Sequence, residues 1–420
     1  MARATPPPNR LPHKSPGREP GDCGNERHPA NDNRMAGPAL TCGRLTPMQP
    51  RHAYVHVPFC RHRCGYCDFT LVAGRDDLVE RYMAALAVEL RRVEEPLALD
   101  TLYLGGGTPS HLGPDGLRRL LTILHERLLP VAGAEVTVEA NPLDVTAEFV
   151  AAARDCGTTR VSLGGQSLDT ATLRALDRDH VADDVCRAVG LLHEAGLVVS
   201  LDLMTAAPGQ SLAAVERDLA AAVALGPQHV SVYCLTWEKG TAFETGRRRG
   251  TLEAVPEDLE RAMFEAAIER LDSGGYEHYE VSNFARPGHR CRHNEAYWDC
   301  RPWEAFGPGA ARFDGRTRIT NHRSTTTWMN RVLAGKEIAG DIDAMSAEEA
   351  ARERLVVGLR RRAGVDRHAF LTASGHDVDQ AAGPAVARWV AAGLATDDGR
   401  MIQLTRAGLL VSDTLWADVL

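Results

Sequence analysis

Three cysteines lie close together in the segment CRHRCGYCDF, residues 60–69, where Cys60, Cys64 and Cys67 are spaced C-x3-C-x2-C. Thiolates are soft ligands that suit zinc or iron–sulfur centres. A structural zinc site needs four ligands, and Phe69 stands where a fourth ligand would be expected, two residues after the last cysteine. Three thiolates on one short loop instead indicate an iron–sulfur cubane with one iron open to a small molecule that carries an amino and a carboxylate group.

Glycine-rich and acidic positions recur further along the chain, each after a short apolar run: residues 105–109 (GGGTP), Glu139, residues 164–167 (GGQS) and Asp202. In a parallel α/β barrel the functional groups gather at the carboxyl ends of the strands, and glycine lets the backbone approach a ligand closely. Each position alone could be an ordinary turn or helix cap. Together with the cysteine loop they predict one binding rim.

Six short runs rich in β-branched residues predict the strands that carry this rim. Helical patterns separate them, for example in 76–95, where apolar residues follow i, i+3, i+4, i+7 spacing. Repeated strand–helix units imply a parallel sheet. Six units are too few to close an eight-stranded barrel, so we expect an α/β fold with an open, partial (β/α)6 barrel. The predicted strands are residues 53–57, 101–104, 135–139, 159–163, 197–203 and 229–235.

The strand–helix rhythm stops after about residue 240. Residues 240–255 (GTAFETGRRRGTLEAV) are predicted to form a loop, and residues 256–275 a helix that begins at a proline and ends at glycines. Residues 345–420 look like a separate small unit with helices at 347–361 and 384–392, a hairpin turn at Asp398-Gly399 and a last helix after Thr405.

This pattern predicts four regions: a disordered Pro-rich tail at 1–50, the barrel core at 51–240, a barrel extension at 241–344 and an α+β, winged-helix-like domain at 345–420. The tail cannot bury enough apolar surface to fold; alternatively, translation starts at Met48. A winged helix could bind DNA, but base reading requires a basic face, and only 352–367 is rich in arginine.

The composition limits the classes of partner. Of 420 residues, 44% are hydrophobic and 25% charged, and the formal net charge is -8. A mild acidic excess argues against nucleic acid as a partner, and no apolar run of about 18 residues is present to cross a membrane. Ten cysteines, scattered except for the one loop, indicate metal chemistry in a reducing cytoplasm. We expect a cytoplasmic monomer or homodimer, with peripheral membrane contact possible.

The cysteine spacing resembles that of the radical S-adenosylmethionine (SAM) superfamily. Similarity extends over about residues 52–415, through YVHVPFCRHRCGYCDF, GGGTP, VEANP, LDRDH, PGQS and HNEAYW. The resemblance implies a 4Fe–4S cluster held by the three cysteines, with SAM on the open iron, where it can be reductively cleaved to a radical. It also implies that SAM is held by Tyr54, Tyr66, Gly106, Gly107, Thr108, Glu139, Gln166, Arg178 and Asp202.

Within this superfamily the chain is similar to a branch that contains oxygen-independent coproporphyrinogen III dehydrogenase (oxidase) and the HemW heme chaperones. The dehydrogenase carries a fourth cysteine where HemW-like proteins, like this chain, carry a phenylalanine, here Phe69. HNEAYW, residues 293–298, resembles the HemW hallmark His-Asn-x-x-Tyr-Trp. The chain departs from the family pattern in GGQS, where Gly165 replaces the usual valine, and in TAAPGQ, which replaces Tyr-Gly-Leu-Pro-Gly-Gln at residues 205–210.

His293 is the predicted heme ligand, because an imidazole beside aromatic residues can bind heme iron. It lies outside the βα repeat, so the barrel core is not expected to need it. Cys291 is a second candidate ligand, and the alternative is a hydrogen-bonded loop histidine beside a core Trp298. The sequence thus favours a chaperone that binds heme and transfers it to acceptor proteins. Alternatives are a radical SAM decarboxylase of coproporphyrinogen III and a radical SAM enzyme with another substrate.

Overall fold

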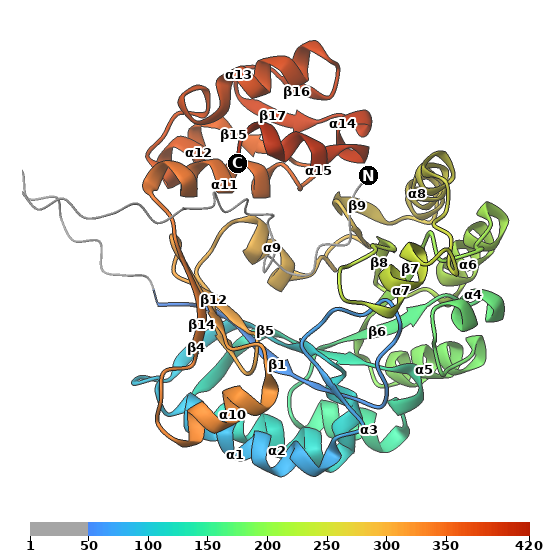
Figure 1. Cartoon of the computed structure of the whole chain (residues 1–420), viewed down its shortest axis with the longest axis vertical. Coiled ribbons are helices and arrows are strands. Elements are labelled where there is room, and N and C mark those ends of the chain that lie inside the picture. Colours follow the sequence, from blue (N-terminus) through green and yellow to red (C-terminus); the bar gives the residue numbers. More distant parts are fainter. Residues whose placement is uncertain (1–48) are drawn as a thin grey trace, which may run out of the picture.

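The computed structural model describes residues 49–420 (Figure 1). The predicted tail, with Cys23 and Cys42, lies outside the described residues except for its last two positions.

A nine-stranded sheet forms the centre of the molecule, in the order β11-β1-β4-β5-β6-β7-β8-β10-β9. Its strands β1, β4, β5, β6, β7 and β8 run parallel and correspond to the six predicted runs. The prediction of an open, partial (β/α)6 barrel is therefore confirmed. β11 (Glu304–Phe306) extends one edge in parallel, and β10 (Asn283–Ala285) with β9 (Glu277–Glu280) extends the other in antiparallel orientation. The six barrel strands are β1 (His52–Val57), β4 (Leu97–Gly106), β5 (Leu128–Ala140), β6 (Arg160–Gln166), β7 (Val198–Thr205) and β8 (His229–Cys234).

Amphipathic helices cover the outer face of this sheet (Figure 1). In α2, Leu117, Leu120, Leu121 and Leu124 repeat at i, i+3, i+4 and i+7 and are fully buried against the strands. The covering helices are α1 (Val79–Leu90), α2 (Gly113–His125), α3 (Ala147–Asp155), α4 (Thr170–Ala175), α5 (Ala182–Glu194), α6 (Leu212–Leu225) and α8 (Glu257–Ser273).

Side chains alternate across the barrel wall because successive residues of a strand point to opposite faces. In β1, Ala53, Val55 and Val57 belong to the apolar core under the helices, whereas Tyr54 and His56 line an inner cavity. The same alternation in the other strands gives the barrel an apolar outer layer and an inner wall that carries the polar side chains of the strands.

The prediction of a loop at residues 240–255 is wrong, because α7 (Ala242–Arg248) forms there. Thr241 caps this helix, its hydroxyl accepting from Glu244 N at 3.1 Å, and buried Phe243 anchors it. The Phe243 amide donates to Gly65 O at 2.9 Å, so α7 braces the cysteine loop.

After α9 (Arg292–Trp298), a small antiparallel sheet of β12 (Ala311–Phe313), β13 (Thr317–Asn321) and β14 (Ala339–Ala344) packs with α10 (Thr325–Leu333) beside the barrel edge. Figure 1 shows α9 between the sheet and the C-terminal unit. A buried ion pair joins that unit to the small sheet, with Arg318 Nη2 2.6 Å from Glu353 Oε1.

The C-terminal unit has its own core, which includes Leu355, Phe370 and Trp389. The predicted hairpin is present, with β16 (Ala395–Asp397) and β17 (Met401–Leu404) paired around Asp398-Gly399. The helix predicted at 384–392 is present as the second part of α13 (Val378–Ala391), whose backbone is non-helical at Ala382, two residues before Pro384, and whose first part is capped by Asp377. The other elements of the unit are α11 (Ala347–Gly358), β15 (Val365–Asp366), α12 (Arg367–Ser374), α14 (Arg406–Leu410) and α15 (Ser412–Leu415).

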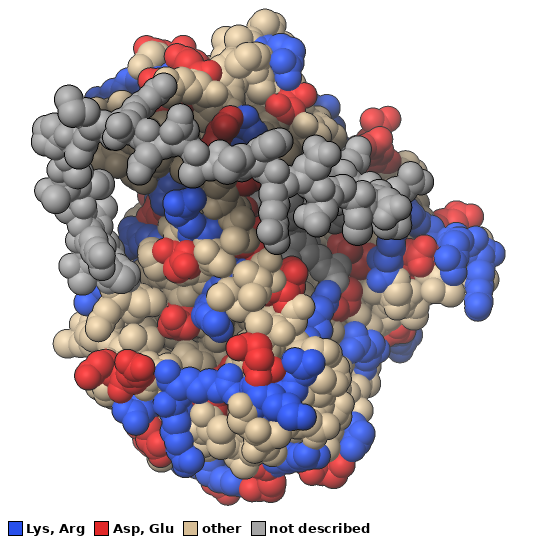
Figure 2. All heavy atoms as spheres, turned by 60° about the vertical axis from the view of Figure 1, so that its left-hand side comes forward, with Lys and Arg blue, Asp and Glu red and all other residues tan. Residues whose placement is uncertain are grey.

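Figure 2 shows acidic and basic side chains mixed over the visible face rather than gathered by sign. Among residues 49–420, no helix is long and apolar enough to cross a bilayer.

Candidate cofactor site

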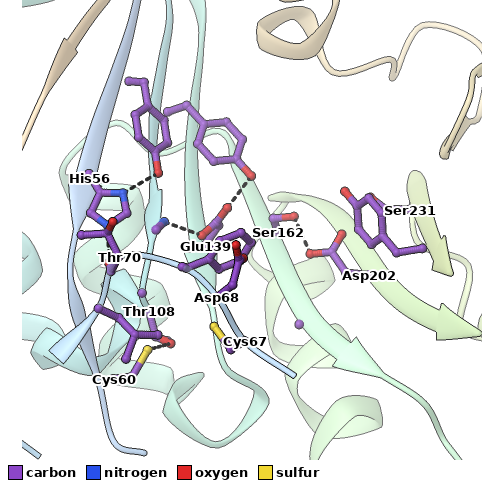
Figure 3. A pocket seen from close by; sticks show the side chains of 18 of the residues that line it. His56, Cys60, Cys67, Asp68, Thr70, Thr108, Glu139, Ser162, Asp202 and Ser231 are labelled. Carbon is purple, nitrogen blue, oxygen red and sulfur yellow. Dashed lines mark hydrogen bonds between the residues drawn. The ribbon is translucent and has the colours of Figure 1, made fainter. Parts of the chain in front are cut away.

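The cysteine loop is closed at its base by a short parallel strand pair. β2 (Phe59–Cys60) pairs with β3 (Val72–Ala73), and Cys67 N donates to Cys64 O at 3.0 Å in a turn between them. All three thiols line one cavity of about 730 Å³ inside the barrel. Cys60 Sγ lies 3.2 Å from Thr108 Oγ1, a contact drawn in Figure 3.

The donor set fits an iron–sulfur cluster. Burial raises the pKa of Cys60 to about 12 and that of Cys67 to about 11, so both are neutral thiols that need a bound cation to become thiolates. Within residues 49–420, no three His, Cys, Asp or Glu side chains are placed to hold a single metal ion together. A cubane offers each thiolate its own iron, so its ligands need not converge on one point as zinc ligands do.

The glycine turn after β4 comes very close to the cysteine loop. A Cβ on Gly107 would lie 2.7 Å from Phe59 O, and Gly106 has a φ of +114°, a conformation that favours glycine. The Gly106 amide donates to Glu139 Oε2 and the Tyr103 hydroxyl to Glu139 Oε1, each at 2.9 Å. Burial raises the pKa of Glu139 to about 7 despite these hydrogen bonds.

Arg178 and Asp202 complete the rim beside the cysteines. Arg178 donates from Nη2 to Gly164 O at 3.0 Å and from Nη1 towards Cys64 Sγ at 3.7 Å. Asp202 Oδ2 accepts from the Ser162 hydroxyl at 3.0 Å, and burial raises the pKa of Asp202 to about 6. In Figure 3, Cys60 and Cys67 lie below Glu139, and Asp202 lies across the cavity.

The strand that carries Asp202, β7, ends in a strained turn. Ala206 has a φ of +61° at the position where the family pattern has glycine. The departure noted in the sequence therefore places an L side chain in a left-handed conformation beside the predicted SAM site.

His293 lies at the far end of the same cavity. It is 1% exposed, and both ring nitrogens are engaged, Nδ1 with Thr101 Oγ1 at 2.7 Å and Nε2 with the Tyr297 hydroxyl at 2.9 Å. Its ring stacks on Tyr103 at 5.1 Å between centroids. The expectation that the barrel does not need His293 is wrong. His293 bonds to Thr101 on β4, and Thr101 pairs with His52, the first residue of β1, so the histidine is part of the contacts between these two strands.

The alternative ligand, Cys291, is also buried at this end. Its thiol donates to Glu135 Oε1 at 3.5 Å, and burial holds its pKa well above the usual range. Glu135 also accepts from the amides of Arg292 and His293, at 3.2 and 3.1 Å. The start of α9 is therefore tied to the barrel wall.

Every predicted site residue lines this one cavity, although the cysteines and His293 stand at opposite ends of the strands. Sequence reasoning missed polar residues inside the strands that also line it. The available signal was a polar residue at alternate strand positions. The missed residues are His56, Tyr103, Thr137, Arg160, Ser162, Ser200, His229 and Ser231.

Comparisons with known proteins agree with this architecture. Residues 54–222 match the family model of the radical SAM superfamily, and residues 345–411 match that of the HemN C-terminal domain. The solved structure of coproporphyrinogen III oxidase (HemN) from Escherichia coli superposes with a TM-score of 0.79 over 89% of this chain and 90% of that one, at 20% identity. At that identity the likeness shows a shared fold.

Curated relatives are closer in sequence. Heme chaperone HemW of Mycobacterium tuberculosis (strain ATCC 25618 / H37Rv) is 38% identical over 381 residues, covering 88% of this chain and 95% of the relative. Heme chaperone HemW of Bacillus subtilis (strain 168) is 31% identical over 372 residues, covering 87% and 98%. A cavity bounded by three cysteines and the His-Asn-x-x-Tyr-Trp motif, together with these matches, places the chain in the HemW family of the radical SAM superfamily.

Proposed function

We propose that this protein is a heme chaperone that binds heme, passes it to heme-accepting proteins and carries a SAM-ligated 4Fe–4S cluster. The observation that carries the proposal is the cysteine loop with Phe69, since this loop supplies three thiols and an apolar ring in place of a fourth. Phe69 is 45% exposed and borders the cavity. Relatives named heme chaperone HemW, similar over nearly their whole length, support it.

The residues around the cysteines fit the role of holding SAM. The cluster, when bound, supplies an open iron that chelates an amino and a carboxylate group. The turn at Gly106 and Gly107 leaves backbone exposed next to the thiols. Arg178 offers a cation beside Cys64, and the carboxyl groups of Glu139 and Asp202 can accept from ribose or amino donors.

The His293 end fits heme for a different reason. Tyr54 and Tyr103 stack at 6.1 Å between centroids and offer flat apolar surface for a porphyrin. Burial lowers the pKa of His293 to about 3, so its ring is neutral at pH 7, as a metal ligand must be. Binding iron through Nε2 would require the ring to give up its hydrogen bond with Tyr297.

The second candidate function is radical decarboxylation of coproporphyrinogen III. The shared fold with HemN favours it, whereas Phe69 in place of a fourth cysteine speaks against it.

One anaerobic preparation tests both functions. After reconstitution with iron and sulfide, it is titrated with heme and incubated with an apo-cytochrome to follow transfer. The same preparation, given SAM, reductant and coproporphyrinogen III, is assayed for 5′-deoxyadenosine and protoporphyrinogen. We expect heme binding and transfer without protoporphyrinogen. Absence of heme binding, or formation of protoporphyrinogen, would overturn the proposal.

A further inference from the structure

Two buried polar groups on neighbouring strands face the cavity without a partner in the described part of the chain. Thr137 on β5 is 1% exposed and Arg160 on β6 is 4% exposed, and the two are direct register partners. Both line the cavity. Neither Thr137 Oγ1 nor Arg160 Nη1 has a hydrogen-bond partner within residues 49–420.

The remaining donors of Arg160 hold its guanidinium in place. Nε lies 3.1 Å from Glu135 Oε2, and Nη2 donates to His289 O and Arg290 O at 2.9 and 3.2 Å. Only Nη1 is left over. A buried donor without a partner costs about 1–3 kcal/mol, so native proteins keep such groups where water or a ligand satisfies them.

The pair lies away from the cysteine end. Thr137 pairs with Tyr103 of β4, and Tyr103 lies three residues before Gly106 of the glycine turn. Glu139 and Ser162, the next inward-facing residues of the same two strands, lie between the pair and the cysteines, and Figure 3 shows both. Glu135 accepts from Arg160 Nε, from the Cys291 thiol and from two backbone amides of α9, and it leaves Arg160 Nη1 without a partner in the described residues. A cationic donor beside a hydroxyl donor is complementary to a carboxylate, which accepts at both oxygens.

We propose that Thr137 and Arg160 form a subsite for a carboxylate of an organic ligand, one oxygen accepting from Arg160 Nη1 and the other from the Thr137 hydroxyl. The proposal rests on the proposed function and deepens it, because heme carries two propionates that could enter this subsite. SAM carries a carboxylate as well, so the test separates the two sources.

Thr137→Val is the informative variant, because it removes a hydroxyl that bonds to nothing else in the described chain and keeps the side-chain volume. Thr158→Val is the matched control: its Oγ1 is also buried and without a partner, but Thr158 does not line the cavity. Both variants should unfold at the urea concentration of the parent protein or at a higher one, because each loses a buried hydroxyl without a partner. A destabilised Thr137→Val would mean that the fold uses this hydroxyl and would overturn the proposal.

Parent and variants are titrated anaerobically with heme, heme dimethyl ester, SAM and decarboxylated SAM. We expect Thr137→Val to bind heme about tenfold more weakly, because it loses one hydrogen bond to a charged group. It should bind the ester as the parent does. The same loss with SAM, absent with decarboxylated SAM, would support the subsite and identify SAM as its occupant. Parent-like affinity of Thr137→Val for both heme and SAM would refute it.

The heme and SAM titrations also distinguish a failure of the carboxylate subsite from a failure of the chaperone function. If the parent protein does not bind heme, the chaperone function fails, and the SAM arm alone then decides the carboxylate subsite. Arg160→Lys provides a second measurement, since it keeps a cation for Glu135 but cannot reproduce the three-nitrogen geometry. It should weaken binding of the same carboxylate-bearing ligand by at least tenfold. Unchanged binding would overturn the role of Arg160.

Discussion

Replacing Tyr297 by phenylalanine should make heme bind more tightly if His293 is the iron ligand. Tyr297 is 5% exposed, and its hydroxyl lies 2.9 Å from His293 Nε2. When the hydroxyl donates this hydrogen bond, it occupies the lone pair that iron would use. Such a bond contributes about 1 kcal/mol, and heme must break it before iron can bind. Removing the hydroxyl should therefore strengthen heme binding by about fivefold.

The assay is an anaerobic heme titration followed in the Soret region, with urea unfolding measured in parallel. Tyr297→Phe should lower the stability by about 1 kcal/mol while raising the heme affinity. His293→Ala should weaken heme binding about 10–100-fold and keep the iron–sulfur cluster. His293→Ala also removes two hydrogen bonds and a buried ring, so its stability should fall by about 2–4 kcal/mol.

The two variants must move heme affinity in opposite directions. If Tyr297→Phe binds heme no more tightly than the parent protein, His293 Nε2 does not bind iron. If His293→Ala also titrates as the parent does, His293 serves only the fold, and Cys291 becomes the next ligand to test.

Four further predictions concern other parts of the chain. Cys60→Ala should lose bound iron and the absorption at about 400 nm typical of 4Fe–4S clusters while keeping some heme. The control variant Cys156→Ala should keep the iron, the absorption and the heme. Stoichiometric zinc without iron in the reconstituted parent would contradict the cluster assignment. The parent protein should not decarboxylate coproporphyrinogen III with SAM and reductant, because Phe69 replaces the cysteine of the dehydrogenase, and any turnover seen by chromatography would refute this. Ala206→Gly should raise the free energy of unfolding by about 0.5–1 kcal/mol in urea, since relief of the left-handed strain exceeds the entropy cost of glycine, and a loss of stability would show that the strain is absent. Burial raises the pKa of Glu89 from 4.5 to about 7, so the folded state holds this proton more tightly and stability should fall as pH rises from 4.5 to 7; Glu89→Gln should flatten the profile, and an unchanged profile would contradict the raised pKa.

The cysteine loop and the glycine turn could be predicted from sequence because their chemistry is local. The spacing of the three cysteines alone limits the metal centres that they suit. The parallel strands then bring their carboxyl ends to one edge, which places Gly106, Glu139 and Asp202 beside the cysteines without knowledge of any long-range contact.

The location of His293 could not be predicted in the same way. Its partner Thr101 is 192 residues away, and no periodicity in HNEAYW shows that a short helix inserts into the barrel. The burial of Arg160 could not be predicted, because a charged residue that opens a strand is usually exposed and its partners, Glu135 and the carbonyls of His289 and Arg290, are distant in sequence. The sequence around α7 favours a loop, because it contains glycines and three consecutive arginines and only the buried Phe243 anchors the helix.

Tyr103 joins the two ends of the cavity. Its ring stacks on His293 at 5.1 Å, and its hydroxyl donates to Glu139, which accepts in turn from the Gly106 amide in the turn beside the cysteines. A ligand that displaces His293 disturbs the face of Tyr103, and a ligand that donates to Glu139 competes with the Tyr103 hydroxyl for that carboxylate. We therefore expect binding at one end to change the affinity at the other, and linkage requires the two changes in binding free energy to be equal. The cysteine end and the His293 end of the cavity are thus linked through one inward-facing tyrosine on β4.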